Sequence, residues 1–255
     1  MCLAGNIPIW ALGRHLETNR LFPIWNLEFF YSYTEEDVFS VIRSHTIDVT
    51  PHFYKIAALD CSHLNRLEAG YLGKTSCTSR QTMHDKTSGQ LMLTNDRQFV
   101  FVDAKTRKPV PVPASIAKHY KSSGRQLYID VQAAPADCFS VTRRAQYSDY
   151  DVRYHVSSFY FARWCLDAAA EAVHSRRLRH FPEDMAEYRL RRLELFHMSE
   201  VFVRETVSIK VWECSNSEDT LLFRVDKPAA DGTVEDVAFC RMTFYPLSFG
   251  WDSKL

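Results

Sequence analysis

The pattern of hydrophobic positions is clearest in the second half of the chain. Residues 140–151 alternate in the manner of a strand, and the apolar residues of 156–178 recur at helical spacing, which predicts a long helix. Pro182 and the acids after it favour a first helical turn and predict a second, short helix. Further alternating segments predict strands. These segments are residues 204–213, 221–225 and 237–245.

The first half repeats this order of elements. Residues 7–19 predict a long helix, and residues 34–42 predict a short one, because Thr34 can cap it and acids follow at once. The turn at 85–89 suits a hairpin. Strand-like segments lie on both sides of that turn and end before a run of prolines. They are residues 45–50, 64–83 and 91–103, with the stop at 108–113.

Each half therefore predicts an α+β module in which one long helix packs on a curved antiparallel sheet. We expect module 1 at residues 1–113, a linker at 114–139 and module 2 at 140–250. The second half has a strand before its long helix, whereas only Met1–Gly5 precede the helix of the first half. The first module is thus expected to be truncated and to lack its first strand. A reactive site should occur once per chain, in the second module.

Composition narrows the classes of function. The 255 residues include 31 Lys and Arg and 31 Asp and Glu, so no basic excess indicates nucleic acid. No apolar run approaches the roughly 18 residues that a membrane span needs, and no signal peptide is recognised at the N-terminus. Seven cysteines without a CxxC pair argue against a zinc site and for a reducing intracellular compartment, either cytoplasm or mitochondrial matrix. Neither a metal nor a cofactor is expected.

Residues 147–160 are the most informative stretch. Asp149, Asp151, Arg153 and His155 come immediately before the apolar helix. A helix N-terminus favours negative charge because its first N–H groups are unpaired and its dipole is positive there. A carboxylate, an imidazole and such donors together suit acyl-transfer chemistry.

Ser148 to Tyr160, with the sequence S-D-Y-D-V-R-Y-H-V-S-S-F-Y, resembles the S-D-x-D-x-N-x-H-V-N-N-x-x-Y signature of hot-dog-fold acyl thioesterases. The acyl-ACP thioesterases, which are double hot-dogs, and the 4-hydroxybenzoyl-CoA thioesterase group are the most similar. Residues 73–113 resemble the last three strands of the same fold. The resemblance spans residues 6–113 and 140–246, and it implies a tandem (double) hot-dog fold.

The resemblance also implies roles for single residues. Asp151 matches the acid that serves as base or nucleophile, and His155 matches the motif histidine. Glu200, which ends the strand-like segment 193–200, is the best match for a further acid. The implied substrate-binding positions depart from the family pattern. They are Arg153, where asparagine is usual, Ser157 and Ser158, where two asparagines are usual, and Tyr160, which falls one position early.

Arginine at position 153 changes the chemistry. An asparagine can both donate and accept hydrogen bonds, whereas arginine only donates and is always charged. Arg153 would pair with Asp149 or Asp151. That pair would either keep a base ionised or fill the pocket. The alternative interpretation is structural, with a loop carboxylate that caps the helix and a packed His155.

Two functions of different classes follow. The first is hydrolysis of an acyl-CoA or acyl-ACP thioester, in fatty acid metabolism. Its acyl chain would lie in a tunnel lined by Phe159, Phe161 and Trp164, and backbone N–H groups near Val156–Ser158 would stabilise the oxyanion. The second is a catalytically inactive hot-dog protein that serves as a structural or acyl-binding subunit of a larger assembly, for instance in mitochondria. Dehydratase chemistry is a third option. The sequence leaves open whether the protein is an enzyme and whether it forms a homo-oligomer.

Overall fold

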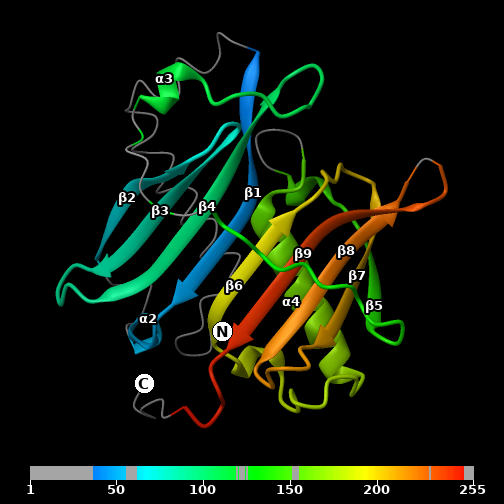
Figure 1. Ribbon diagram of the computed structural model, residues 1–255. Helices are drawn as coiled ribbons and strands as arrows, with labels where there is room; N and C mark the ends of the chain where they lie inside the picture. The colour runs from blue at the N-terminus through cyan, green and yellow to red at the C-terminus, as the bar shows by residue number, and fades with distance from the viewer. Residues whose placement is uncertain are drawn as a thin grey trace. The chain divides into compact units, whose positions relative to one another are not determined.

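The computed structural model describes residues 37–55, 62–118, 120, 124, 126–150, 155–229 and 231–249. These residues divide into two compact units, with the boundary between Ile129 and Asp130. The N-terminal unit and the C-terminal unit each contain one antiparallel set of strands (Figure 1). The predicted helix at 7–19 lies outside the described residues, and the predicted module and linker bounds stay a prediction.

In the N-terminal unit, four strands lie in the order β2-β3-β4-β1, and every neighbouring pair is antiparallel. The elements are β1 (Val38–Val49), α2 (Pro51–Lys55), β2 (His63–Leu72), β3 (Ser76–Asp85), β4 (Leu91–Asp103) and α3 (Ala114–Ala117). The prediction of a strand at 91–103 is confirmed by β4. The segment predicted at 64–83 is two strands rather than one, joined by a tight turn at Gly73.

The prediction of a short helix at 34–42 is wrong for its described part. Residues from Val38 onward belong to β1, where Val38 faces Asp103 and Ile42 faces Phe99 on β4. Branched side chains such as Val41 and Ile42 favour a strand. The paired strand β4 supplies backbone partners that outweigh the local capping signal at Thr34.

In the C-terminal unit, five strands lie in the order β6-β9-β8-β7-β5. The elements are β5 (Phe139–Arg144), the 3₁₀ turn η2 (Tyr147–Asp149), α4 (Ser158–His174), the 3₁₀ turn η3 (Met185–Glu187), β6 (Leu190–His197), β7 (Thr206–Glu213), β8 (Thr220–Pro228) and β9 (Val234–Phe244). The strand predicted at 140–151 is confirmed only as far as Arg144, where β5 ends, because residues 147–149 form the turn η2; the helix predicted after Pro182 is the single turn η3. Among its described residues, the N-terminal unit has no counterpart of β5.

Helix α4 lies across one face of the sheet of its own unit (Figure 1). The buried face of the helix combines one large side chain, Trp164, with small residues such as Ala168 and Ala169, and all three are fully enclosed. Small residues let the helix backbone approach the strands closely. Burial and a hydrogen bond with Cys165 of the helix raise the pKa of the Cys240 thiol on β9 well above its usual value. The two thiols therefore meet in the dry contact between helix and sheet.

The sheet of the N-terminal unit buries polar side chains where the C-terminal unit buries apolar ones. By strand register, His45, Ser79, Gln81, Asn95 and Arg97 share one face of β1, β3 and β4, and all five are buried. Arg97 Nη2 donates to Gln81 Oε1. In the described part of the chain, the Asn95 amide and the Ser79 hydroxyl make no hydrogen bond. A buried polar group without a partner costs stability.

The predicted hairpin turn at 85–89 joins β3 to β4. The Asp85 carboxylate accepts hydrogen bonds from the Ser88 hydroxyl and from the Thr87 N–H at 2.9 Å. Gly89 adopts a left-handed backbone (φ 71°) that L side chains rarely take, and its N–H donates to Asp85 O at 2.8 Å. The Ser88 hydroxyl first, and then the Thr87 N–H, lower the pKa of Asp85 from 3.8 to about 2.

This turn predicts an acid-dependent contribution to stability. The folded pKa of Asp85 is depressed, so its contribution is present above about pH 4 and is lost as the pH falls towards 2. The difference in urea midpoint between the wild type and Asp85→Asn should be larger at pH 6 than at pH 3. The control Ser88→Ala keeps the carboxylate but removes its main donor, and it should show a smaller pH dependence than the wild type. An equal wild-type to Asp85→Asn difference at both pH values would contradict the assignment.

Candidate functional site

The predicted reactive stretch lies in the C-terminal unit, between β5 and α4. Asp151 and Arg153 lie outside the described residues. The structure describes the chain up to Tyr150 and again from His155. The site can therefore be built from the two described ends of the stretch and from the elements that contact them. We call residues 147–150 the first stem and residues 155–158 the second stem.

On the first stem, both the side chain and the carbonyl of Asp149 accept hydrogen bonds from backbone N–H groups. Its carboxylate accepts from Gln146 N–H at 2.8 Å and closes the turn η2, and the residue is only 1% exposed. Its carbonyl accepts from Ser157 N–H at 3.0 Å. Next to it, the Tyr150 hydroxyl accepts from Val203 N–H at 2.5 Å. The first stem is thus bonded both to the start of α4, through Ser157, and to the segment after β6, through Val203.

On the other side of the stretch, extended residues lead into α4. Val156 pairs with Tyr150 in an isolated antiparallel bridge, and its N–H donates to Val201 O at 2.9 Å. Ser157 is the N-cap residue (φ −61°, ψ 144°), yet its side chain makes no capping hydrogen bond. Most N-cap serines use their oxygen to accept from the first turn. The Ser157 side chain therefore does not cap the helix, and the residue lies two positions after the half-buried His155.

The expected oxyanion donors are only partly available. The N–H groups of Val156 and Ser157 already donate to Val201 O and Asp149 O. The prediction that these two amides stabilise an oxyanion is therefore wrong, because an amide proton held in a backbone bond cannot also face a substrate. The sequence could not reveal this, because Val201 lies 45 residues after Val156 and no sequence signal marks a bond from Ser157 N–H back to Asp149 O.

Glu200 lies near the start of α4 because the next residue, Val201, bonds to Val156. Val201 O binds Val156 N–H, so Glu200 and His155 are each one residue away from that bond. Tyr160 lies half-buried in the first turn of α4, and Ser158 begins the helix. Ser157, Ser158 and Tyr160 thus lie at the start of α4, and His155 and Glu200 are chain neighbours of the Val156–Val201 bond beside it, while their catalytic and binding roles stay predictions.

The tunnel expected beside α4 is not formed by the three residues named for it. Phe159, Phe161 and Trp164 are 1%, 2% and 0% exposed. The Phe161 and Trp164 rings pack edge to face at 5.3 Å, and Phe161 also packs against His197 at 5.4 Å. These side chains fill the space between helix and sheet, so they are core residues and do not line an open tunnel.

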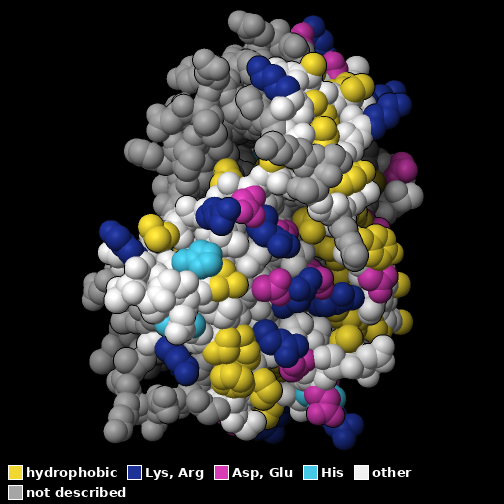
Figure 2. Space-filling view, turned by 60° about the vertical axis from the view of Figure 1, so that its left-hand side comes forward, with side chains coloured by type: hydrophobic (Ala, Val, Ile, Leu, Met, Phe, Trp, Pro, Cys, Tyr) yellow, Lys and Arg dark blue, Asp and Glu magenta, His cyan; other side chains and the backbone are white. Residues whose placement is uncertain are grey.

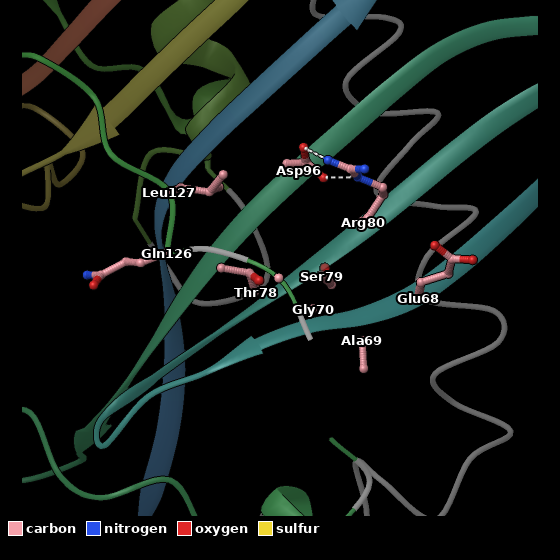
Figure 3. Close-up of a pocket in the computed structure, with 10 residues that line it drawn as sticks. Glu68, Ala69, Gly70, Thr78, Ser79, Arg80, Asp96, Gln126 and Leu127 are labelled. Atoms are coloured by element: carbon pink, nitrogen blue, oxygen red, sulfur yellow. Dashed lines mark hydrogen bonds and ion pairs between the residues drawn. The ribbon is translucent and has the colours of Figure 1, made fainter. Parts of the chain in front are cut away.

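A pocket that the sequence did not predict lies in the N-terminal unit (Figure 3). It has a volume of about 410 Å³ and is lined from β2, β3, β4 and the segment around Gln126. Arg80 and Asp96 form a two-pronged ion pair on its wall, at 2.7 and 2.8 Å. A Cβ atom at Gly70 would lie 2.4 Å from the Thr78 hydroxyl oxygen. Glu68, also on the wall, pairs with Arg66, and the lining residues include none of the motif stretch.

A serine, a histidine and an aspartate also meet at the β3–β4 turn. His52 Nε2 lies 3.3 Å from Asp85 Oδ2 and 3.4 Å from Ser88 Oγ. Ser88 Oγ itself donates to the same Asp85 oxygen. A nucleophile must give its proton to the base, with the acid behind the base. Here the carboxylate holds both other groups, so the cluster stabilises a turn.

Metal-binding groups, membrane-spanning helices and surface charge would be further signs of function. No group of three or more His, Cys, Asp and Glu side chains in the described part of the chain could hold a metal ion. None of the described helices is long and apolar enough to cross a membrane. On the face in Figure 2, basic and acidic side chains are interspersed, in keeping with the balanced composition.

The arrangement of the elements matches solved structures over nearly the whole chain. An acyl-ACP thioesterase from Bacteroides thetaiotaomicron is similar with a TM-score of 0.73 and 18% identity, over 96% of this chain and 93% of that one. A 12:0-ACP thioesterase from Umbellularia californica is similar with a TM-score of 0.71 and 12% identity, over 95% and 91%. The chain has the double hot-dog fold. No protein-family model and no curated protein matches its sequence.

At these identities the likeness shows the fold alone. Part of the peroxisomal multifunctional enzyme type 2 from Drosophila melanogaster is also similar, with a TM-score of 0.51 and 10% identity over 88% of this chain and 40% of that one. Proteins with different names thus share the hot-dog arrangement, and function has to be argued from the residues at the site.

The hydrogen bond between Tyr150 and Val203 predicts a local effect at the stem of the site. In Tyr150→Phe, the Val203 amide loses its acceptor, which should cost about 1 kcal/mol. Amide exchange at Val203, followed by NMR, should accelerate by about fivefold to tenfold. The control is Tyr147→Phe, since that ring is 80% exposed, and it should leave Val203 unchanged. Equal exchange in both variants would rule out the bond.

Proposed function

We propose that the protein hydrolyses acyl thioesters carried by coenzyme A or by acyl carrier protein. The observation that carries this proposal is the Ser157 hydroxyl, which does not cap α4, next to the Val156–Val201 hydrogen bond that joins the chain neighbours of His155 and Glu200. The fold supports it, because solved acyl-ACP thioesterases share the same arrangement over most of the chain.

Asp151 is the proposed general base or nucleophile. As a base it takes a proton from water while the water oxygen attacks the thioester carbonyl carbon. The carbon–sulfur bond then breaks, and the thiol leaves with a proton, so that a free acid and a free thiol are the products. In the nucleophilic route, the carboxylate attacks first and water hydrolyses the acyl intermediate. Both routes consume one water.

The neighbouring residues have proposed supporting roles. His155 orients the thioester carbonyl or assists proton transfer, and Glu200 is the second acid. The positive charge of Arg153 would favour the ionised form of a carboxylate that it pairs with, Asp151 in this proposal. Ser157, Ser158 and Tyr160 contact the substrate, and the Ser157 hydroxyl is suited to this because the helix does not use it.

Two observations favour a second function, that of an inactive hot-dog protein. The Val156 and Ser157 amides are occupied, and Phe159, Phe161 and Trp164 are closed into the core. Both findings favour an inactive hot-dog protein that binds an acyl group or serves as a structural subunit. The two proposals differ in whether a thiol is released.

Release of free thiol from a panel of short to long acyl-CoA and acyl-ACP substrates tests the choice. Hydrolysis of at least one acyl class above the uncatalysed rate is expected. If no member of the panel is hydrolysed, the thioesterase proposal fails. Binding of an acyl-CoA without hydrolysis would then support the second function.

Replacing the proposed base should abolish most of the turnover. Asp151→Asn keeps the size of the side chain but cannot take a proton, so kcat should fall by about 10²-fold to 10⁴-fold. The control is Asp167→Asn, which removes the same charge from a half-exposed carboxylate on α4 that pairs with Arg143. Its kcat should stay near that of the wild type. Unchanged kcat in Asp151→Asn would remove the residue from the mechanism.

A further inference from the structure

The segment between β6 and β7, residues 198–205, contacts both stems of the reactive stretch; we refer to it as the β6–β7 connection. Val203 N–H donates to the Tyr150 hydroxyl on the first stem. Val201 O accepts from Val156 N–H on the second stem. The connection therefore holds Tyr150 and Val156, the residues that it contacts on the two sides of Asp151.

The β6–β7 connection contains no helix or strand, so its own position needs other support. At one end, the N–H groups of Met198 and Ser199 donate to Val237 O at 2.8 and 3.1 Å. At the other end, Arg204 N–H donates to Ala145 O, and Ala145 N–H donates to Glu205 O. These bonds fix the two ends. The middle, which carries Val201 and Val203, has one internal backbone bond, from Glu205 N–H to Phe202 O at 3.1 Å, and is otherwise held by side chains.

Lys227 holds that middle. Its ammonium comes from β8 and donates to Glu200 O at 2.7 Å and to Glu205 Oε2 at 3.2 Å. Glu205 Oε2 in turn accepts from Phe202 N–H at 2.8 Å. One cation thus ties together two points of the connection that lie five residues apart, and it does so on either side of Val201 and Val203.

The environment of Lys227 makes this link strong. The residue is 8% exposed, and a buried ammonium is stable only when its protons are satisfied. Besides Glu200 O and Glu205, the Glu235 carboxylate lies 3.8 Å away on the paired strand β9. Removing the ammonium would leave the Glu205 carboxylate without its cation and Glu200 O without its donor, so the connection would relax.

We propose that Lys227 is a positioning residue that acts through the β6–β7 connection to hold Tyr150 and Val156 in place on the two sides of Asp151. This inference rests on the proposed thioesterase function for its kinetic consequence, although its structural consequence does not depend on activity. Lys227 acts through the connection on the two stems. Displacement of catalytic groups by about 1 Å can cost about 10²-fold in rate.

The test compares variants of the full-length chain. Lys227→Met keeps the length of the side chain and removes the charge, and Lys227→Arg keeps a cationic donor. The matched control is Lys210→Met, because Lys210 also forms an ion pair on the same sheet, with Asp226 at 2.7 Å, but does not touch the connection. Glu205→Gln removes the partner charge and keeps an acceptor for Phe202 N–H, and it serves if Lys227→Met does not fold.

Two measurements are expected to respond. Amide exchange at Val156 and Val203 should accelerate by about tenfold or more in Lys227→Met, and should stay within about twofold of the wild type in Lys210→Met. On the acyl thioester that the wild type hydrolyses best, kcat should fall by about 10-fold to 100-fold with KM nearly unchanged, since the binding contacts remain. Lys227→Arg should restore most of both.

Equal exchange in Lys227→Met and Lys210→Met would overturn the proposal, as would an unchanged kcat or a failure of Lys227→Arg to restore either quantity. Where Glu205→Gln takes the place of Lys227→Met, exchange no faster than in Lys210→Met would do the same. If the wild type hydrolyses no thioester, the proposed function fails, while exchange at Val156 and Val203 still decides whether Lys227 positions the stretch.

Discussion

Close packing of α4 on its sheet is the interaction on which the candidate site depends. Ala162, Ala168 and Ala169 are fully enclosed and bring the helix backbone onto the strands, and burial of Phe159 at the first turn contributes about 1.5–3 kcal/mol. Sliding the helix would open cavities in this contact, and cavities are costly. The first turn is therefore fixed in place. The Ser157 hydroxyl, which does not cap the helix, is fixed with it.

The sequence was sufficient where local signals and tertiary pairing agreed. The strand at 91–103 was predicted with its correct ends, because alternation, the turn at 85–89 and the following prolines all act locally. The stretch at 34–42 was misread, since acids after Thr34 resemble a helix start. The strand β1 forms there because β4, which lies about 60 residues later, supplies its backbone partners. The residues at 34–42 alone contain no information about their pairing with β4.

At the site, the order of His155, Ser157 and the long helix could be read from the sequence, whereas the state of the amides could not. Val201 O comes from a segment about 45 residues after Val156, and nothing in either segment signals the bond. The same limit applies to the N-terminal unit. Asn95 and Arg97 interrupt an alternating strand, and only the strand register shows that both face inward and are buried.

The anchoring of the two stems has a consequence for divergence. The hydrogen bonds described at Tyr150, Val156 and Ser157 use backbone groups and one phenol, so they do not depend on the side chains at positions 151, 153 and 155. Substitutions at those positions can change the chemistry while the frame around them persists. Arginine and serines at positions where related motifs carry asparagine are therefore compatible with an intact fold, and selection for catalysis and selection for folding act here on different atoms.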